Sequence, residues 1–234
     1  EDTFDTICDH FPDYGYSPFM NEKFFDDWSH DLKWGIHQAR CVVGHNLKVA
    51  WNLTRMHSLM PKESYKTFAH QIADAIPGAG CDNQRGGWYD MMERTLKDGE
   101  ENYRRVWHDR KAWWQQEQGI LAYYIMAGVY DDKPEYLNYA REGSAFYNGW
   151  FLDYEEGGIY FNVLANGQPY SLGSERGKGS HSMAGYHSFE LCFLSAVYTN
   201  LLVNKQPMDF FFKPNPHAWP ENKLRVAPDI LPEG

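Results

Sequence analysis

The sequence lacks several features that mark large protein classes. No apolar run reaches the ~20 residues that a helix needs to span a bilayer, and the first residues, EDTFD, do not resemble a signal peptide. The glycine-rich stretch 173–179 does not follow the P-loop pattern. We therefore expect neither a membrane partner nor a nucleotide site of that kind. The missing initiator methionine predicts a processed chain or a piece of a longer one.

Cysteine is scarce, with 4 residues at positions 8, 41, 81 and 192. None lies within metal-ligand spacing of another, and no histidine and carboxylate cluster has such spacing, so we expect no metal and no other cofactor. Scattered free thiols suit a reducing compartment, which predicts a cytoplasmic protein. A disulfide pair in a secreted protein stays open as the alternative.

Basic residues are also few, with 22 Lys and Arg against 32 Asp and Glu, a net charge of −10 and a pI near 5.4. Such a chain repels phosphate backbones, which argues against nucleic acid as a partner. Aromatic residues, by contrast, make up 17% of the chain. They indicate either a bulky helical core or a carbohydrate site, because a flat ring matches the C–H face of a pyranose.

Helical spacing of apolar residues recurs along a chain long enough for one domain. Pro61 ends the first pattern, Pro77-Gly78 closes the second, and Pro134 suits the first turn of the fourth. The predicted helices span residues 43–59, 62–76, 111–129, 134–150 and 188–204.

Short β segments are predicted between these helices. The first 40 residues are irregular, with 24–28 as a strand or loop. A hairpin or loop is predicted at 85–90, and a strand at 157–163 leads through an Asn-Gly turn to a return strand at 169–172.

The motifs GGWY at 86–89 and GGIY at 157–160 each follow a pair of predicted helices. This repeat predicts an all-α fold of stacked helical hairpins with short β-hairpins in the connecting loops. We assign residues 1–206 to one domain. The proline-rich residues 207–234 form a surface tail or the start of a missing domain.

Three stretches together resemble the N-acylglucosamine 2-epimerase family, which includes cellobiose 2-epimerases and aldose–ketose isomerases. They are GHNLKVAW at 44–51, KAWWQQE at 111–117 and GYH at 185–187. The resemblance covers most of residues 20–205 and implies an (α/α)6 barrel. Since the chain holds about half of the twelve helices of such a barrel, we expect a missing N-terminal half or a second chain to complete it.

The resemblance implies that His45 and His187 are the catalytic acid/base pair. A hydrogen next to an aldehyde carbonyl is weakly acidic, and an imidazole titrates near neutrality, so two imidazoles can move a proton between the faces of a carbon. We expect the helix start beside His187 to favour its neutral form. The alternative for His45 is a helix-capping or buried polar residue.

The same resemblance places sugar-binding residues around this pair. Trp114 and Glu117 lie three apart on one predicted helix, so they share a face, where Trp114 would stack on a sugar and Glu117 would bond its hydroxyls. Alternatively, Trp113 or Trp114 belongs to the core and Glu117 forms a salt bridge. The other candidate binding residues are Lys48, Trp51, Tyr186 and His181.

Two positions depart from the family pattern. Lys48 replaces a glutamate three residues after the first histidine, and a cation there would depress the pKa of His45. Lys48 could pair with a carboxylate such as Glu117, contact an anionic substrate or act as a base. Ser182 replaces a tryptophan of the cellobiose epimerases, and the adjacent His181 could compensate for it.

The sequence therefore predicts a sugar epimerase or isomerase that moves a proton at C2 of an aldose or N-acyl amino sugar. A glycoside hydrolase is one alternative, but it needs two carboxylates across a glycosidic bond. A non-catalytic carbohydrate-binding module is the other, and Lys48 is its main support. The candidate carboxylates for hydrolysis are Asp90, Glu93, Glu117, Asp153 and Glu156.

Overall fold

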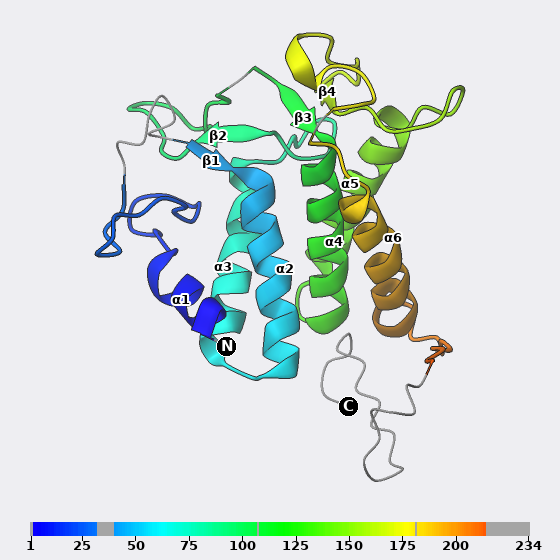
Figure 1. Ribbon diagram of the computed structural model, residues 1–234. Helices are drawn as coiled ribbons and strands as arrows, with labels where there is room; N and C mark the ends of the chain where they lie inside the picture. The colour runs from blue at the N-terminus through cyan, green and yellow to red at the C-terminus, as the bar shows by residue number, and fades with distance from the viewer. Residues whose placement is uncertain (1, 32–39, 107, 181, 214–234) are drawn as a thin grey trace.

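The computed structural model describes residues 2–31, 40–106, 108–180 and 182–213 (Figure 1). Helices dominate this part of the chain, and none of them combines the length and apolar character needed to cross a membrane. The helices are α1 (Asp2–His10), α2 (Val43–Leu59), α3 (Glu63–Ala79), α4 (Trp113–Val129), α5 (Pro134–Trp150) and α6 (Tyr186–Tyr198), with a 3₁₀ turn at Gly173–Glu175 and a π-helical turn at Thr199–Val203.

Short strands form two separate antiparallel pairs. Strand β1 (Arg40–Val42) pairs with β2 (Met91–Glu93), and β3 (Arg110–Ala112) pairs with β4 (Asn162–Leu164). The predicted all-α architecture with small β elements in its connections is confirmed.

Helices α2, α4 and α6 pack side by side, while α3 packs on α2 and α5 packs on α4. Both strand pairs lie at the same end of the bundle, the upper end in Figure 1. Strand β1 runs directly into α2, and β3 runs directly into α4. The amino-terminal ends of these helices are thereby held together under the β layer.

The two Gly-Gly motifs form matching turns after the outer helices α3 and α5. All four glycines have positive φ, between 75° and 91°, which other residues rarely adopt. After the first turn, Trp88 enters the core, where it is 1% exposed. A Cβ at Gly119 or Gly143 would lie 2.6 or 2.3 Å from its ring, so these glycines allow α4 and α5 to close on the indole.

Several predicted boundaries hold and several need correction. The helices at 43–59 and 134–150 are confirmed. The helix predicted from Lys111 begins at Trp113, because Lys111 pairs with Val163 across two strands. The predicted strand 157–163 is reduced to β4, which begins at residue 162, and the return strand 169–172 contributes one bridge, at Pro169.

The ends of the described chain also differ from the predictions. Helix α1 lies within the segment predicted to be irregular and packs on α3. The final helix begins at Tyr186 rather than at Ser188, and its last turn is π-helical. Of the predicted tail, residues 207–213 form no helix or strand, and residues 214–234 lie outside the described residues.

Helix α3 continues through Pro77, although the sequence predicted that it would end there. Proline has no N–H, so the carbonyl of Ala73 loses its helical partner. The buried Tyr123 hydroxyl of α4 donates to that carbonyl oxygen at 2.9 Å. The replacement bond satisfies the buried acceptor, and the helix therefore runs to Ala79.

We expect Tyr123→Phe to lower the free energy of unfolding by about 1–3 kcal/mol, because the Ala73 carbonyl becomes a buried acceptor without a partner. In a Pro77→Ala background the helix supplies its own N–H, so the same substitution should cost clearly less. Urea unfolding of the four proteins in this double-mutant cycle measures the difference. Equal losses in both backgrounds would contradict the explanation.

Candidate active site

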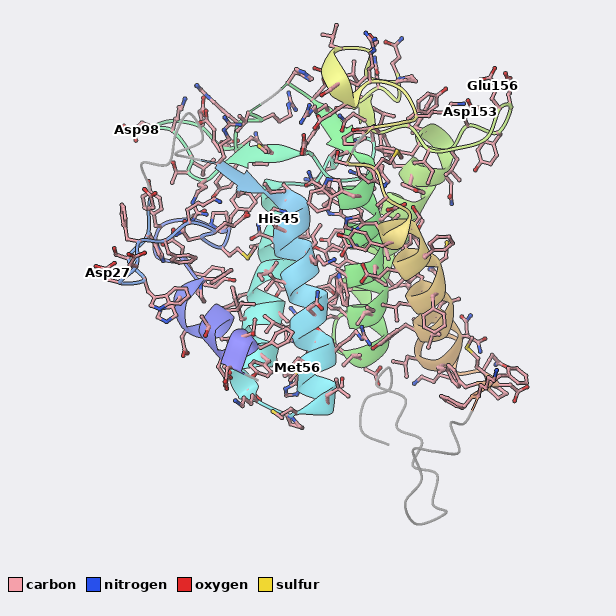
Figure 2. All side chains as sticks on the ribbon, viewed as in Figure 1. Asp27, His45, Met56, Asp98, Asp153 and Glu156 are labelled. Carbon is pink, nitrogen blue, oxygen red and sulfur yellow. The ribbon has the colours of Figure 1, made fainter. Side chains whose placement is uncertain are left out.

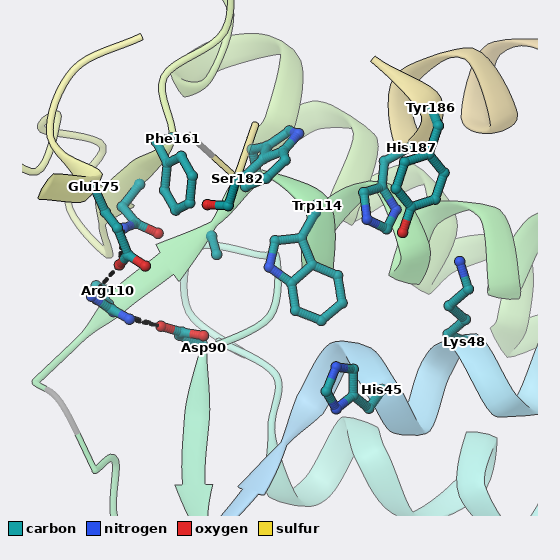
Figure 3. Close-up of a pocket in the computed structure, with 13 residues that line it drawn as sticks. His45, Lys48, Asp90, Arg110, Trp114, Phe161, Glu175, Ser182, Tyr186 and His187 are labelled. Carbon is teal, nitrogen blue, oxygen red and sulfur yellow. Dashed lines mark hydrogen bonds and ion pairs between the residues drawn. The ribbon is translucent and has the colours of Figure 1, made fainter. Parts of the chain in front are cut away.

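A cavity of about 320 Å³ opens at the β end of the helices, which is within the size range of small-ligand pockets (Figure 3). Helices α2, α4 and α6 each contribute a pair of lining residues, and the strands and loops contribute the remainder. The lining residues are His45, Lys48, Trp113, Trp114, Tyr186, His187, Asp90, Arg110, Ala112, Phe161, Asn162, Glu175 and Ser182.

His45, in the first turn of α2, neither caps the helix nor lies buried. The N-cap position is Val42, and the His45 side chain is 47% exposed. Its Nδ1 lies 2.6 Å from Oε2 of Glu22. Because a carboxylate only accepts, the neutral ring donates Nδ1–H to Glu22 and keeps a lone pair on Nε2. This arrangement makes His45 a candidate base.

Glu22 is a site residue that the sequence did not reveal, since it lies in an irregular segment distant from any motif. The other carboxylate oxygen accepts from the backbone N–H of Val42 at 3.3 Å. The segment is fixed by Asn46, whose Oδ1 accepts from the N–H of Met20 at 2.9 Å. The buried guanidinium of Arg94 also donates to the Met20 carbonyl. Glu22 thus supplies the carboxylate that was expected at position 48.

Lys48 pairs with Glu190 rather than with Glu117. Its Nζ lies 3.6 Å from Oε2 of Glu190 and 5.2 Å from the centre of the Tyr186 ring. Both side chains of the ion pair are part-exposed, so water weakens their attraction. The pair joins α2 to α6 across the cavity.

His187 lies in the first turn of α6 and is 8% exposed. Its Nδ1 is 3.0 Å from Nε2 of Gln118. The pKa of His187 is lowered to about 4, mainly by burial and in part by the Lys48 cation, while Glu190 opposes the shift. The sequence predicted a neutral imidazole from the helix start, whereas burial is the main cause in the structure.

The two tryptophans at the start of α4 differ in burial. Trp113 is 3% exposed and packs on Phe161, with ring centres 4.5 Å apart. Trp114 is part-exposed, and its ring centre lies 5.3 Å from that of His45 and 5.5 Å from that of His187. Figure 3 shows the Trp114 indole next to both histidines, with all three side chains lining the cavity.

Two candidate binding residues do not reach the cavity. Trp51 is 2% exposed, and its Nε1 donates to Oε1 of Gln118 at 2.8 Å. Glu117 is fully buried and accepts from the hydroxyls of Tyr147 and Ser188, both at 2.6 Å; burial raises its pKa. A further candidate binding residue, His181, lies outside the described residues.

An arginine between two carboxylates forms the wall opposite the histidines. Arg110 lies 2.5 Å from Asp90 and 3.1 Å from Glu175. Asp90 is 6% exposed, and burial raises its pKa against the opposing effect of Arg110. Since both carboxylates in the cavity wall are bound to one cation, they are poorly placed as the separate acid and base of a hydrolase.

The described residues contain no group of three or more histidine, cysteine or acidic side chains placed to hold a metal ion. The cysteines at positions 8, 41, 81 and 192 are all free thiols.

Comparison with known proteins identifies the fold. No model of a known family matches the chain, and no curated protein matches it. Cellobiose 2-epimerase from Spirochaeta thermophila superimposes with a TM-score of 0.65 at 18% identity, over 86% of this chain and 45% of that one. Cellobiose 2-epimerase from Bacillus thermoamylovorans superimposes with a TM-score of 0.64 at 19% identity, over 81% of this chain and 44% of that one. A D-mannose isomerase superimposes with a TM-score of 0.60 at 20% identity, over 75% of this chain and 42% of that one.

These likenesses show that the chain has part of an (α/α)6-barrel fold, as the sequence predicted. The chain spans less than half the length of each of these three structures.

The pKa of His187 predicts how stability depends on pH. Unfolding restores the ordinary pKa of 6.5, so below that pH the unfolded chain binds the proton first. The stability that the folded protein has with His187 neutral is fully present above pH 6.5. It is lost as the pH falls from 6.5 towards about 4, because the unfolded chain is then stabilised by protonation. At about 1.4 kcal/mol per pH unit, the loss between pH 7 and pH 5 is roughly 2 kcal/mol.

We therefore expect the unfolding free energy of the wild type to fall by about 2 kcal/mol more than that of His187→Gln between these two pH values. Urea titrations of both proteins at each pH measure it. An equal fall in the two proteins would show that His187 does not titrate in this way.

Proposed function

We propose that the protein is a sugar epimerase or isomerase that removes and returns a proton at C2 of an aldose or N-acyl amino sugar. The observation that carries this proposal is the meeting of His45 and His187, from α2 and α6, on the two sides of Trp114 in one cavity. Proteins of similar fold include cellobiose 2-epimerases and a mannose isomerase, which supports the same class of reaction.

The chemistry needs a base at C2 and a partner for the carbonyl. Removal of the C2 proton leaves an enediolate, whose negative charge develops on the carbonyl oxygen. His45, oriented by Glu22, has its Nε2 lone pair available as the base. Trp114 offers an aromatic face to the sugar, while Lys48 and Tyr186 supply polar groups for hydroxyls.

The remaining lining residues fit a neutral, hydroxyl-rich ligand. Arg110, Asn162 and Ser182 add polar groups to the wall opposite the histidines. The Arg110 cation is already paired with two carboxylates, those of Asp90 and Glu175. The main argument for a non-catalytic module was Lys48 in place of an orienting carboxylate, and Glu22 removes that argument.

We also propose that further helices cover α6 and complete the barrel, supplied by a second chain or by a longer form of this one. Tyr186, Phe189 and Phe193 recur at helical spacing on α6 and are 56%, 76% and 57% exposed. Aromatic surface of this extent on one helix face is unusual in a monomer and favours association. The coverage of less than half of the similar structures agrees with a missing part.

We expect the 234-residue chain to associate in solution and the double variant Phe189→Ser with Phe193→Ser to associate at least tenfold more weakly, because it loses apolar area at the contact. Sedimentation across a concentration series measures the mass. Tyr154→Ser is the matched control, since this aromatic residue is 76% exposed on a loop. A wild-type chain that stays monomeric would contradict a second chain as the source of the missing helices.

We expect the wild type, in its associated form, to exchange the C2 hydrogen of at least one sugar with solvent deuterium. Proton NMR in D2O with aldoses, N-acyl amino sugars and β-linked disaccharides follows the C2 signal. His45→Gln should slow this exchange by about 10²–10⁴-fold, because the base is removed. His10→Gln, on the distant helix α1, should leave the rate unchanged.

Two results would overturn the assignment. One is the absence of exchange with every sugar of the panel by folded, associated wild type. The other is exchange that His45→Gln leaves unchanged.

A further inference from the structure

The orientation of the Gln118 side chain is fixed by partners that each allow only one polarity. Trp51 Nε1 can only donate, and it lies 2.8 Å from Oε1 of Gln118. The Glu190 carboxylate can only accept, and it lies 3.0 Å from Nε2 of Gln118. The amide oxygen therefore faces Trp51, and the amide nitrogen faces Glu190.

This orientation determines which nitrogen of His187 carries the proton. The second N–H of the Gln118 amide points to Nδ1 of His187 at 3.0 Å. Nδ1 must accept this hydrogen bond, so in the neutral ring the proton is on Nε2. The network thus gives His187 a donor at Nε2 and leaves no second lone pair on the ring.

His45 has the opposite arrangement. Its Nδ1 donates to Glu22 at 2.6 Å, so in the neutral ring the lone pair is on Nε2. The cavity therefore contains one basic imidazole nitrogen and one donating imidazole N–H. Two-base epimerisation requires a second group that takes or returns a proton at C2, whereas isomerisation requires one base and a donor to the sugar oxygens.

We infer that the reaction is a one-base aldose–ketose isomerisation, in which His45 moves the proton and neutral His187 hydrogen-bonds the carbonyl oxygen. Gln118 is a positioning residue that fixes the His187 tautomer, and Trp51 and Glu190 orient it. This inference rests on the proposed function and narrows it. The substrate is an aldose with a free C2 hydroxyl, because an N-acyl amino sugar lacks the oxygen that becomes the ketone.

The charges around His187 agree with a neutral ring. Lys48 approaches from α2 and Glu190 from α6, and the two form an ion pair with each other at 3.6 Å. The α4 neighbours are the uncharged Gln118 and two tryptophan rings, and the neighbouring Tyr186 is also uncharged. Burial lowers the pKa of His187 to about 4, which keeps the ring neutral at pH 7. A neutral histidine that polarises a carbonyl is an established catalytic arrangement.

The proton and electron transfers balance without a co-reactant. His45 Nε2 takes the C2 proton, the electrons of that C–H bond form the C1–C2 double bond, and the carbonyl π electrons move to O1. His187 Nε2–H donates a hydrogen bond to O1, on which the negative charge develops. The C2 hydroxyl proton then passes to O1, the O2–H electrons form the C2 carbonyl, and the double-bond electrons take the proton from His45 at C1.

The tautomer can be read without any turnover. Long-range ¹H–¹⁵N NMR of the full chain at pH 7, assigned with His187→Gln, should show His187 with an unprotonated Nδ1 and a protonated Nε2. A proton on Nδ1, or on both nitrogens, would overturn the inference.

Gln118→Glu provides the sharper comparison. A carboxylate can only accept, so it should draw the proton to Nδ1 and free the Nε2 lone pair as a second base. Gln118→Met, of similar size, tests for a merely structural role, since it removes the amide without imposing the opposite tautomer. The inference predicts that the proton of His187 moves from Nε2 to Nδ1 in the glutamate variant alone. A move in both variants, or in neither, would contradict the inference.

Product analysis separates failure of the inference from failure of the proposed function. With an aldose deuterated at C2, the wild type should form ketose, with part of the label at C1 and no C2 epimer. Gln118→Glu should begin to form the C2 epimer. An epimer as the main wild-type product would overturn the one-base reaction while C2 proton transfer stands. Absence of C2 exchange with any sugar would instead refute the proposed function, and the tautomer measurement would still stand by itself.

Discussion

The structure depends on four consecutive buried polar side chains in α4. Each is fully buried, and each bonds a different part of the chain. Gln115 bonds the start of α2, Gln116 the backbone at Trp88, Glu117 both α5 and α6, and Gln118 both α2 and α6. An unpaired buried polar group costs about 1–3 kcal/mol. Helix α4 therefore specifies where its neighbours lie as well as stabilising them.

This constraint also builds the cavity. Gln115 accepts from the N–H of Gly44 at 2.7 Å, and a Cβ at Gly44 would lie 2.6 Å from the Gln115 side chain. Only glycine allows this approach, and it brings the next residue, His45, beside Trp114. On the other side, Gln118 holds His187. The two imidazoles thus reach one cavity because their helices are bonded to the same short stretch of α4.

Sequence reasoning located most of the helices because they follow from local signals, whereas the candidate residues of the cavity came from the resemblance to a known family. Apolar spacing located α2 and α5, and the glycine–histidine and tryptophan motifs led to His45, Trp114 and His187. It failed where distant parts of the chain decide the outcome. Tyr123 carries α3 through Pro77, and Glu22 reaches His45 from an irregular segment with no pattern. Helical spacing also placed Glu117 beside Trp114, although it turns towards α5 and α6.

The most direct test of the central claim, that His45 and His187 act together on one sugar, is a crystal structure with a linear hexitol, which mimics the open-chain substrate. The account predicts the hexitol against Trp114, with C2 facing Nε2 of His45 and O1 bonded to Nε2 of His187. A hexitol that binds in this cavity without contacting either histidine, or that binds at another site, would contradict the account.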